Sequence, residues 1–245
     1  MSAYGPLARW YDGLTRDVPY DRFADFFEQA LDREGKEHLT LLDLCCGTGT
    51  LILLLAERGH ELIGVDCAPE MLSVAAEKAS GLDLAFPPLL LCQEAAELDL
   101  YGTVDGAYCS LDGINYLPPE DLPELFRRLH LFIEPGGKFA FDFHSPEHLR
   151  ALDGGTFVDE DDDVFCLWRG EFDAEENALF YGMDIFRREG KLWRREEEEH
   201  IEYAHSAEGL KALLESSGFT DVRLITDGPL SESGRLFMIA VNTGH

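Results

Sequence analysis

The sequence predicts an α/β fold of the doubly wound type, with a mostly parallel sheet covered by helices on both faces. Along residues 38–145, short apolar runs alternate with helical patterns, which is the rhythm of repeated β-α-β units. Along residues 151–205, long β-type runs follow one another instead, which predicts an antiparallel β insert. With 245 residues and 45% hydrophobic side chains, the chain can fill the core of a single domain.

The first segment, residues 1–37, is predicted to be a helical lead-in to the sheet. Between residues 20 and 31, apolar side chains recur at helical spacing. These side chains are Phe23, Phe26, Phe27 and Ala30. The core that follows is expected in two parts, residues 38–150 and 206–245, with the insert between them.

Seven strands are expected in the main sheet. The first five are the apolar runs 39–44, 61–65, 89–92, 106–109 and 138–143. The helices between them are predicted over 51–57, 70–77 and 121–132. The run Pro135-Gly136-Gly137 is a strong turn signal, and this turn is expected before the fifth strand.

The C-terminal part completes the sheet. Residues 207–216 have a helical pattern that ends before Gly218, a typical helix stop. Two β-type runs follow, 219–225 and 235–241, and no helical pattern separates them. They are therefore expected to form a hairpin, which places one antiparallel strand in an otherwise parallel sheet.

The insert is predicted to contain three strands, over 164–172, 178–187 and 191–203, joined by turns. It is strongly acidic, because residues 153–205 carry 17 acidic and 6 basic side chains. The acidic runs 159–163 and 196–199 are interpreted as solvated surface, with recognition of a small cationic substrate as the alternative. Glu198 and His200 share one strand face, either in an exposed ion-pair ladder with Arg194 or facing the cleft beneath the insert.

Composition excludes several classes of partner. The chain has 48 Asp and Glu against 20 Lys and Arg, a formal net charge of −28 at pH 7. Because such a surface repels phosphate, nucleic acids and anionic membranes are not expected as partners. The sequence has no apolar run of about 18 residues and no secretory leader pattern, so a cytoplasmic protein is expected. The oligomeric state stays open between monomer and homodimer.

The six cysteines do not form a CxxC pair, and most lie in apolar or glycine-rich stretches. This placement favours reduced, buried thiols over a disulfide framework or a zinc site. No metal site is predicted.

The most informative segment is a glycine-containing turn between the first strand and the next helix. Gly47 and Gly49 let backbone amides approach a ligand, and the helix N-terminus adds partial positive charge. Asp66 ends the second strand about 20 residues later, where a carboxylate can accept hydrogen bonds from ribose hydroxyls. A cap for the following helix is the alternative role for Asp66. A dinucleotide site would carry a third glycine, but Ile52 stands at that position.

The run Asp43-x-Cys45-Cys46-Gly47-Thr48-Gly49 resembles the first motif of class I S-adenosylmethionine-dependent methyltransferases. Cys45 stands where that motif usually has its first glycine. Further segments resemble the same family: 64–72, 93–96, 108–117, 135–137 and 216–219. The resemblance covers most of residues 38–145 and 206–245, and it implies a Rossmann-like fold that binds S-adenosylmethionine.

By this resemblance, the cofactor site includes residues from five segments of the chain. They are Tyr11, Asp43, Gly47, Thr48, Gly49, Asp66, Cys67, Met71, Gln93, Glu94, Ala95 and Cys109. The resemblance places Met71 and the 93–96 segment at the adenine, and the 108–117 segment at the methionine part and the methyl group. The lead-in, with Tyr11 and Tyr20, also resembles a bacterial subfamily of the small-molecule type. Tyr11 and Tyr20 would close over the cofactor, or would simply pack in the core.

The acceptor side is less defined. His144 lies just past the fifth strand, at the sheet edge where ligands bind, so it is the candidate base or an ordinary loop histidine. Tyr20, Asn115 and Tyr116 are candidate substrate residues; the alternative for Asn115 and Tyr116 is that they begin the helix that follows. Trp168 and Trp193 could form walls of an acceptor pocket or pack within the insert.

The predicted function is methyl transfer from S-adenosylmethionine to a small-molecule acceptor by in-line displacement. The alternative is a cofactor-binding sensor without transfer activity, since methyl transfer requires no fixed catalytic residue. A nicotinamide-dependent oxidoreductase is a further alternative, which the missing third glycine disfavours.

Overall fold

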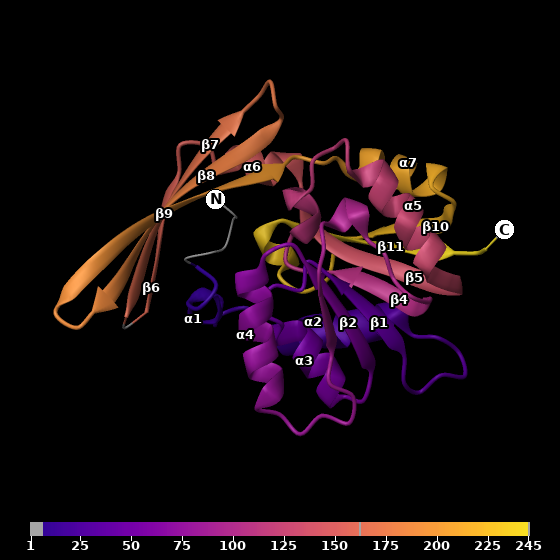
Figure 1. The fold of residues 1–245 in the computed structure, drawn as a ribbon. Coiled ribbons are helices and arrows are strands. Elements are labelled where there is room, and N and C mark those ends of the chain that lie inside the picture. The colour runs from indigo at the N-terminus through magenta and orange to yellow at the C-terminus, as the bar shows by residue number, and fades with distance from the viewer. Residues whose placement is uncertain (1–6, 162, 245) are drawn as a thin grey trace.

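The computed structural model describes residues 7–161 and 163–244, so six residues of the predicted lead-in lie outside the described part. A seven-stranded sheet has the order β10-β11-β5-β4-β1-β2-β3 (Figure 1). Its strands are β1 Thr40–Leu44, β2 Glu61–Asp66, β3 Leu89–Cys92, β4 Val104–Cys109, β5 Ile133–His144, β10 Phe219–Ile225 and β11 Arg235–Asn242. Strand β11 pairs antiparallel with both β10 and β5. The predicted fold class and the C-terminal hairpin are confirmed.

Helices cover both faces of this sheet. They are α2 Tyr20–Leu31, α3 Thr50–Glu57, α4 Pro69–Ser80, α5 Leu122–Phe132 and α7 Ala207–Ser216. The two short helices α1 Tyr11–Leu14 and α6 Pro146–Ala151 pack against the insert instead. One buried cluster joins the sheet to α5 and α7, and a second joins it to α2 and α3. Phe27 of α2 packs on Tyr108 of β4, with ring centroids 5.1 Å apart. The apolar side chains at helical spacing in the lead-in therefore pack against one face of the sheet.

The turn predicted before the fifth strand lies inside β5. The pairing of β4 with β5 shifts register between Val104, opposite Ile133, and Gly106, opposite Lys138. Pro135, Gly136 and Gly137 therefore loop out of the strand, and Gly136 has a φ of +83°. The turn chemistry produces a bulge, because strand pairing resumes on both sides of it.

The insert has four strands, one more than predicted. They are β6 Thr156–Asp161, β7 Val164–Asp173, β8 Ala178–Glu189 and β9 Leu192–Tyr203, in the order β6-β7-β8-β9 and all antiparallel. Strand β6 was missed because its side chains, including three consecutive acidic ones, are all exposed. An edge strand with charged side chains has no buried face to give an alternating pattern.

The insert sheet holds the N-terminal segment against the rest of the molecule. Leu7 packs with Val164, Cys166, Met183 and Ile185, and Trp10, Tyr11 and Leu14 pack around them. The Leu7 N–H donates to Glu198 Oε1 at 3.0 Å. Glu198 Oε2 lies 3.0 Å from His200 Nε2, and both side chains are buried. Solvated surface is therefore the wrong prediction for Glu198, and an exposed ladder with Arg194 is the wrong one for this pair.

The six cysteines are free, as predicted, but only Cys46, Cys109 and Cys166 are buried. Cys67 and Cys92 are exposed, because they lie at the ends of strands where the sheet meets the loops. Among the residues that the structure describes, no helix is long and apolar enough to cross a membrane.

Candidate active site

The turn after β1 is shaped by positive φ angles at Cys45 (59°), Gly47 (53°) and Gly49 (78°). A Cβ built on Gly49 would lie 2.9 Å from the Cβ of Ala75, so this glycine allows α3 to approach α4. A Cβ on Gly47 would meet no atom within 4 Å. Gly47 therefore faces open space, as a ligand-facing glycine must, and Gly49 serves packing.

A cavity of about 500 Å³ lies at the carboxyl ends of β1, β2 and β4, beside this turn. That volume is within the range of ordinary cofactor sites. Nine of the predicted cofactor residues line it: Tyr11, Gly47, Thr48, Asp66, Cys67, Met71, Gln93, Glu94 and Ala95. Tyr20 and Tyr116, predicted on the substrate side, line it as well. Residues 110–121 after β4 contribute further lining that sequence reasoning assigned only in part, including Leu111, Leu117 and Asp121.

Asp66 connects the glycine turn to the start of α4. Its Oδ2 accepts a hydrogen bond from the Gly47 N–H at 2.8 Å, and its Oδ1 accepts one from the Ala68 N–H at 2.9 Å. Ala68 is the residue that caps α4, so Asp66 also supports that helix. Burial raises the pKa of Asp66. The carboxylate is thus held in place at the cavity wall by two backbone hydrogen bonds, and ribose binding by it stays a prediction.

Three of the predicted cofactor residues lie outside the cavity lining and pack in the protein around it. Asp43 is fully buried, and burial raises its pKa well above the ordinary value. Gly49 packs on α4, as described above. The buried Cys109 Sγ lies 2.7 Å from where a Cβ on Gly113 would be, so Gly113 lets the 110–116 loop approach β4. These three residues do not line the cavity.

Helix α1 is tied to the glycine turn by Asp12, a residue that sequence reasoning missed. Asp12 Oδ1 accepts hydrogen bonds from Thr48 Oγ1 at 2.5 Å and from Thr50 Oγ1 at 3.1 Å. Its Oδ2 accepts one from Lys78 Nζ at 2.7 Å. Asp12 directly follows Tyr11, so this network holds Tyr11 over the cavity. The adjacent Tyr11-Asp12 pair in the lead-in was the available signal.

A second cavity, of about 340 Å³, lies between the main sheet and the insert. Tyr11, Leu111 and Tyr116 line both cavities, so the two adjoin there. The insert contributes Phe157, Asp159, Trp168, Tyr181 and Glu202, and the main domain contributes Asp112 and Arg235 among others. Trp168 is thus a wall residue, as one alternative predicted, whereas Trp193 lines neither cavity and its side chain is half exposed.

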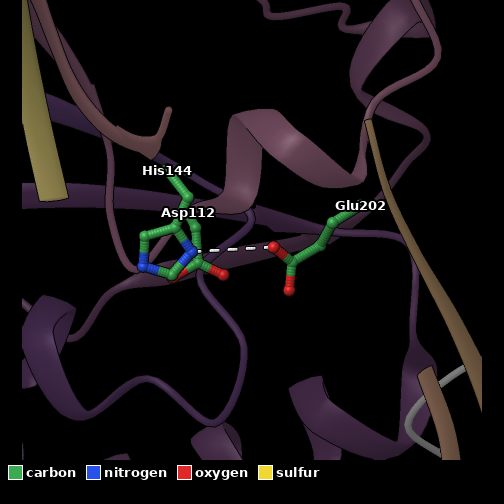
Figure 2. A group of neighbouring side chains, drawn as sticks. All are labelled: Asp112, His144 and Glu202. Carbon is green, nitrogen blue, oxygen red and sulfur yellow. Dashed lines mark ion pairs between the residues drawn. The ribbon is translucent and has the colours of Figure 1, made fainter. Parts of the chain in front are cut away.

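A cluster of three side chains lies at the wall of the second cavity (Figure 2). Asp112, His144 and Glu202 each present one ligand-type atom, and these atoms lie within 4.8 Å of one another. His144 Nδ1 is 3.6 Å from Glu202 Oε2. Burial lowers the pKa of His144 and raises that of Glu202 well above its usual value. His144 itself lines neither cavity, whereas its neighbour Glu202 lines the second one.

Asn115 joins the main sheet to the insert. Its Nδ2 donates to the backbone oxygens of His144 at 3.2 Å and Tyr203 at 2.9 Å, and its Oδ1 accepts from the His144 N–H at 2.9 Å. The side chain is completely buried and lines neither cavity. Asn115, which was predicted as a substrate residue, therefore holds the backbone at His144 and Tyr203 in place next to the cluster.

Comparisons with known proteins agree with this geometry. A family model described as "Methyltransferase domain" matches residues 41–137. A protein of Bacillus subtilis (strain 168) that is named as a methyltransferase, YqeM, is 32% identical over 97% of this chain and 96% of its own length. The crystal structure of an S-adenosylmethionine-dependent methyltransferase from Clostridium acetobutylicum ATCC 824 superposes with a TM-score of 0.83. It is 29% identical and covers 98% of this chain and 99% of its own.

The sugar N-methyltransferase KedS8 from Streptoalloteichus sp ATCC 53650 shares the fold, with a TM-score of 0.78. It is 22% identical over 94% of this chain and 90% of its own. The cavity beside Gly47 has a volume in the range of cofactor sites, and the Asp66 carboxylate in its lining can accept hydrogen bonds from ribose hydroxyls. The protein is an enzyme and uses this cofactor. This chain belongs to the class I S-adenosylmethionine-dependent methyltransferases.

Proposed function

We propose that the enzyme methylates a small molecule that binds in the second cavity, beneath the insert. The observation that carries this proposal is the shared lining of the two cavities by Tyr11, Leu111 and Tyr116. A nucleophile held in the second cavity reaches the cofactor cavity at these residues. A volume of about 340 Å³ suits a metabolite-sized acceptor, within the usual range of small-molecule sites.

Each part of the chain has a role in the transfer. Gly47 and Asp66 hold the nucleoside and sugar parts of the cofactor, and Asp12 keeps Tyr11 closed over them. Bound S-adenosylmethionine supplies a methyl group that its sulfonium already activates. The protein's contribution is therefore orientation, which brings the nucleophile in line with the sulfur–methyl bond and excludes water. Tyr116, at the meeting of the cavities, orients the acceptor.

The fold neighbour KedS8 is named as a sugar N-methyltransferase, which supports an acceptor of small-molecule size. The net charge of −28 also favours such an acceptor over a nucleic acid, whose phosphates the surface would repel.

The test is to incubate the protein with methyl-labelled S-adenosylmethionine and a cellular metabolite extract. We expect label in the low-molecular-mass fraction, and none with Asp66→Ala, which lacks the ribose-binding carboxylate. Glu61→Gln, an exposed position on the same strand, is the matched control and should transfer label normally. Tight cofactor binding without labelled product, or label only in macromolecules, would contradict the proposal.

A further inference from the structure

More carboxyl groups than cationic side chains lie at the second cavity. Asp112, Asp142 and Glu202 face a single guanidinium, that of Arg235. Arg235 is occupied by the two aspartates: it pairs with Asp112 at 2.7 Å and makes a short contact with Asp142. Asp142 is further satisfied by the backbone N–H groups of Leu111 and Asp112. Among the described residues, no arginine or lysine pairs with Glu202. His144 lies at ion-pair distance from it, but burial lowers the pKa of that histidine.

Glu202 is almost completely enclosed, with 5% of its side chain exposed. Tyr116 makes a hydrogen bond to the Glu202 carboxyl group. Among the described residues, however, neither Glu202 Oε2 nor His144 Nδ1, which lies 3.6 Å from it, has a hydrogen-bond partner. Figure 2 shows these two atoms directed toward each other, with the Asp112 carboxylate beside them. Buried carboxylates in proteins are normally paired or hydrogen-bonded, so this arrangement is suited to a positively charged ligand.

The other walls of the cavity favour an organic cation. Tyr11, Tyr116, Trp168 and Tyr181 contribute aromatic side chains around the carboxylates. Aromatic rings attract ammonium groups through their electron-rich faces, most strongly where water is excluded. Carboxylates combined with aromatic rings therefore indicate an amine.

We propose that the acceptor is an aliphatic amine whose ammonium group is held by Asp112 and Glu202, and that Glu202 removes its proton. This inference rests on the proposed function, because it names the acceptor of the same cavity. The ammonium gives one proton to Glu202 and becomes a neutral amine. The nitrogen lone pair then forms a bond to the methyl carbon while the carbon–sulfur bond breaks. The electron pair of the broken carbon–sulfur bond stays on sulfur, which gives the thioether S-adenosylhomocysteine. The product leaves as a methylated ammonium ion.

Glu202 is the catalytic residue in this scheme because it lines the cavity. His144 is a positioning residue, since its Nδ1 faces Glu202 from behind. The groups that face Glu202 are Asp112, Tyr116, His144, Tyr181, His200 and Arg235. Burial and the charge of Asp112 raise the pKa of Glu202. The carboxylate accepts a proton only when ionised, so the rate should rise with pH through the pKa of Glu202.

The decisive experiment divides one metabolite extract in two and blocks the amines of one half by acetylation. Both halves are incubated with the enzyme and methyl-labelled S-adenosylmethionine. We expect labelled N-methyl product from the untreated half and at least a tenfold loss from the acetylated half. Equal labelling of both halves would overturn the amine inference and leave the proposed function standing. No label from either half would contradict the proposed function itself, and the inference with it.

Variants test the role of Glu202 on the amine-containing extract. Glu202→Gln should lower kcat at least tenfold and remove the rising limb of the pH profile. His144→Gln should move that limb while activity persists at high pH. Glu199→Gln, on the exposed face of the same strand, should behave as wild type. An unchanged pH profile in Glu202→Gln would overturn the assignment, as would activity that a chelator abolishes and a divalent ion restores.

Discussion

At the residue scale, the Asp66 side chain has two structural roles. Its two oxygens bind the N–H groups of Gly47 and Ala68, so the same carboxylate shapes the turn and faces the cofactor cavity. Both roles that the sequence suggested, ribose acceptor and helix support, are compatible with this geometry.

We expect Asp66→Asn to weaken S-adenosylhomocysteine binding by about 1.5 to 3 kcal/mol, the cost of losing hydrogen bonds to a charged group. This corresponds to roughly a ten- to 150-fold rise in Kd. Isothermal titration calorimetry measures it, with Glu61→Gln as the control. An unchanged Kd would remove Asp66 from the cofactor site.

Gly47 and Gly49 allow a paired test at the same turn. Gly47→Val should greatly weaken cofactor binding while costing only about 1 to 2 kcal/mol of stability, since it adds φ strain without a clash. Gly49→Val should lower the melting temperature further, because its Cβ would lie 2.9 Å from that of Ala75. Thermal unfolding and calorimetry on both variants check this. A larger stability loss at Gly47 than at Gly49 would contradict the assignment of roles.

The predicted cofactor residues coincide with the cavity where a motif and a strand end occur together. Gly47, Asp66 and Met71 follow directly from such positions, and all three line the cavity. Glu202 and Asp112 could not be predicted, because their proximity depends on how the insert folds back over the main sheet. His144 was proposed because it follows the fifth apolar run; it is the last residue of β5, and it lines neither cavity.

At the scale of elements, strand β9 stabilises the N-terminal segment, whose Tyr11 lines the first cavity. Glu198→Ala removes the acceptor of the buried Leu7 N–H, a loss of about 1 to 3 kcal/mol. We expect a lower melting temperature and weaker S-adenosylhomocysteine binding, because Tyr11 is held less firmly. Glu199→Ala removes an exposed side chain from the same strand and is the control. Equal binding by both variants would show that β9 does not hold α1 in place.

Element boundaries followed the sequence closely where apolar periodicity was strong, as in β3, β10 and α7. The edge strand β6 was missed, because pairing with β7 stabilises it in spite of its exposed charges. The short helix α6 was missed as well. It begins at Pro146 and is capped by the Ser145 side chain, and six residues give too few turns for a periodic pattern.

At the scale of the whole molecule, a net charge of −28 on 245 residues opposes folding through self-repulsion. Salt screens this repulsion, since the Debye length falls to about 10 Å at 0.1 M. We expect the melting temperature to rise with sodium chloride from low to moderate concentration. A melting temperature that falls over this range would mean that local ion pairs outweigh the overall repulsion.

The central claim is that the turn at Gly47 and the carboxylate of Asp66 hold the cofactor beside an acceptor cavity under the insert. A crystal structure of the protein with S-adenosylhomocysteine tests it most directly. The expected result is a ribose whose hydroxyls donate to Asp66, with the thioether sulfur directed toward Tyr11 and Tyr116. A ligand bound elsewhere, or a sulfur facing away from the second cavity, would contradict the claim.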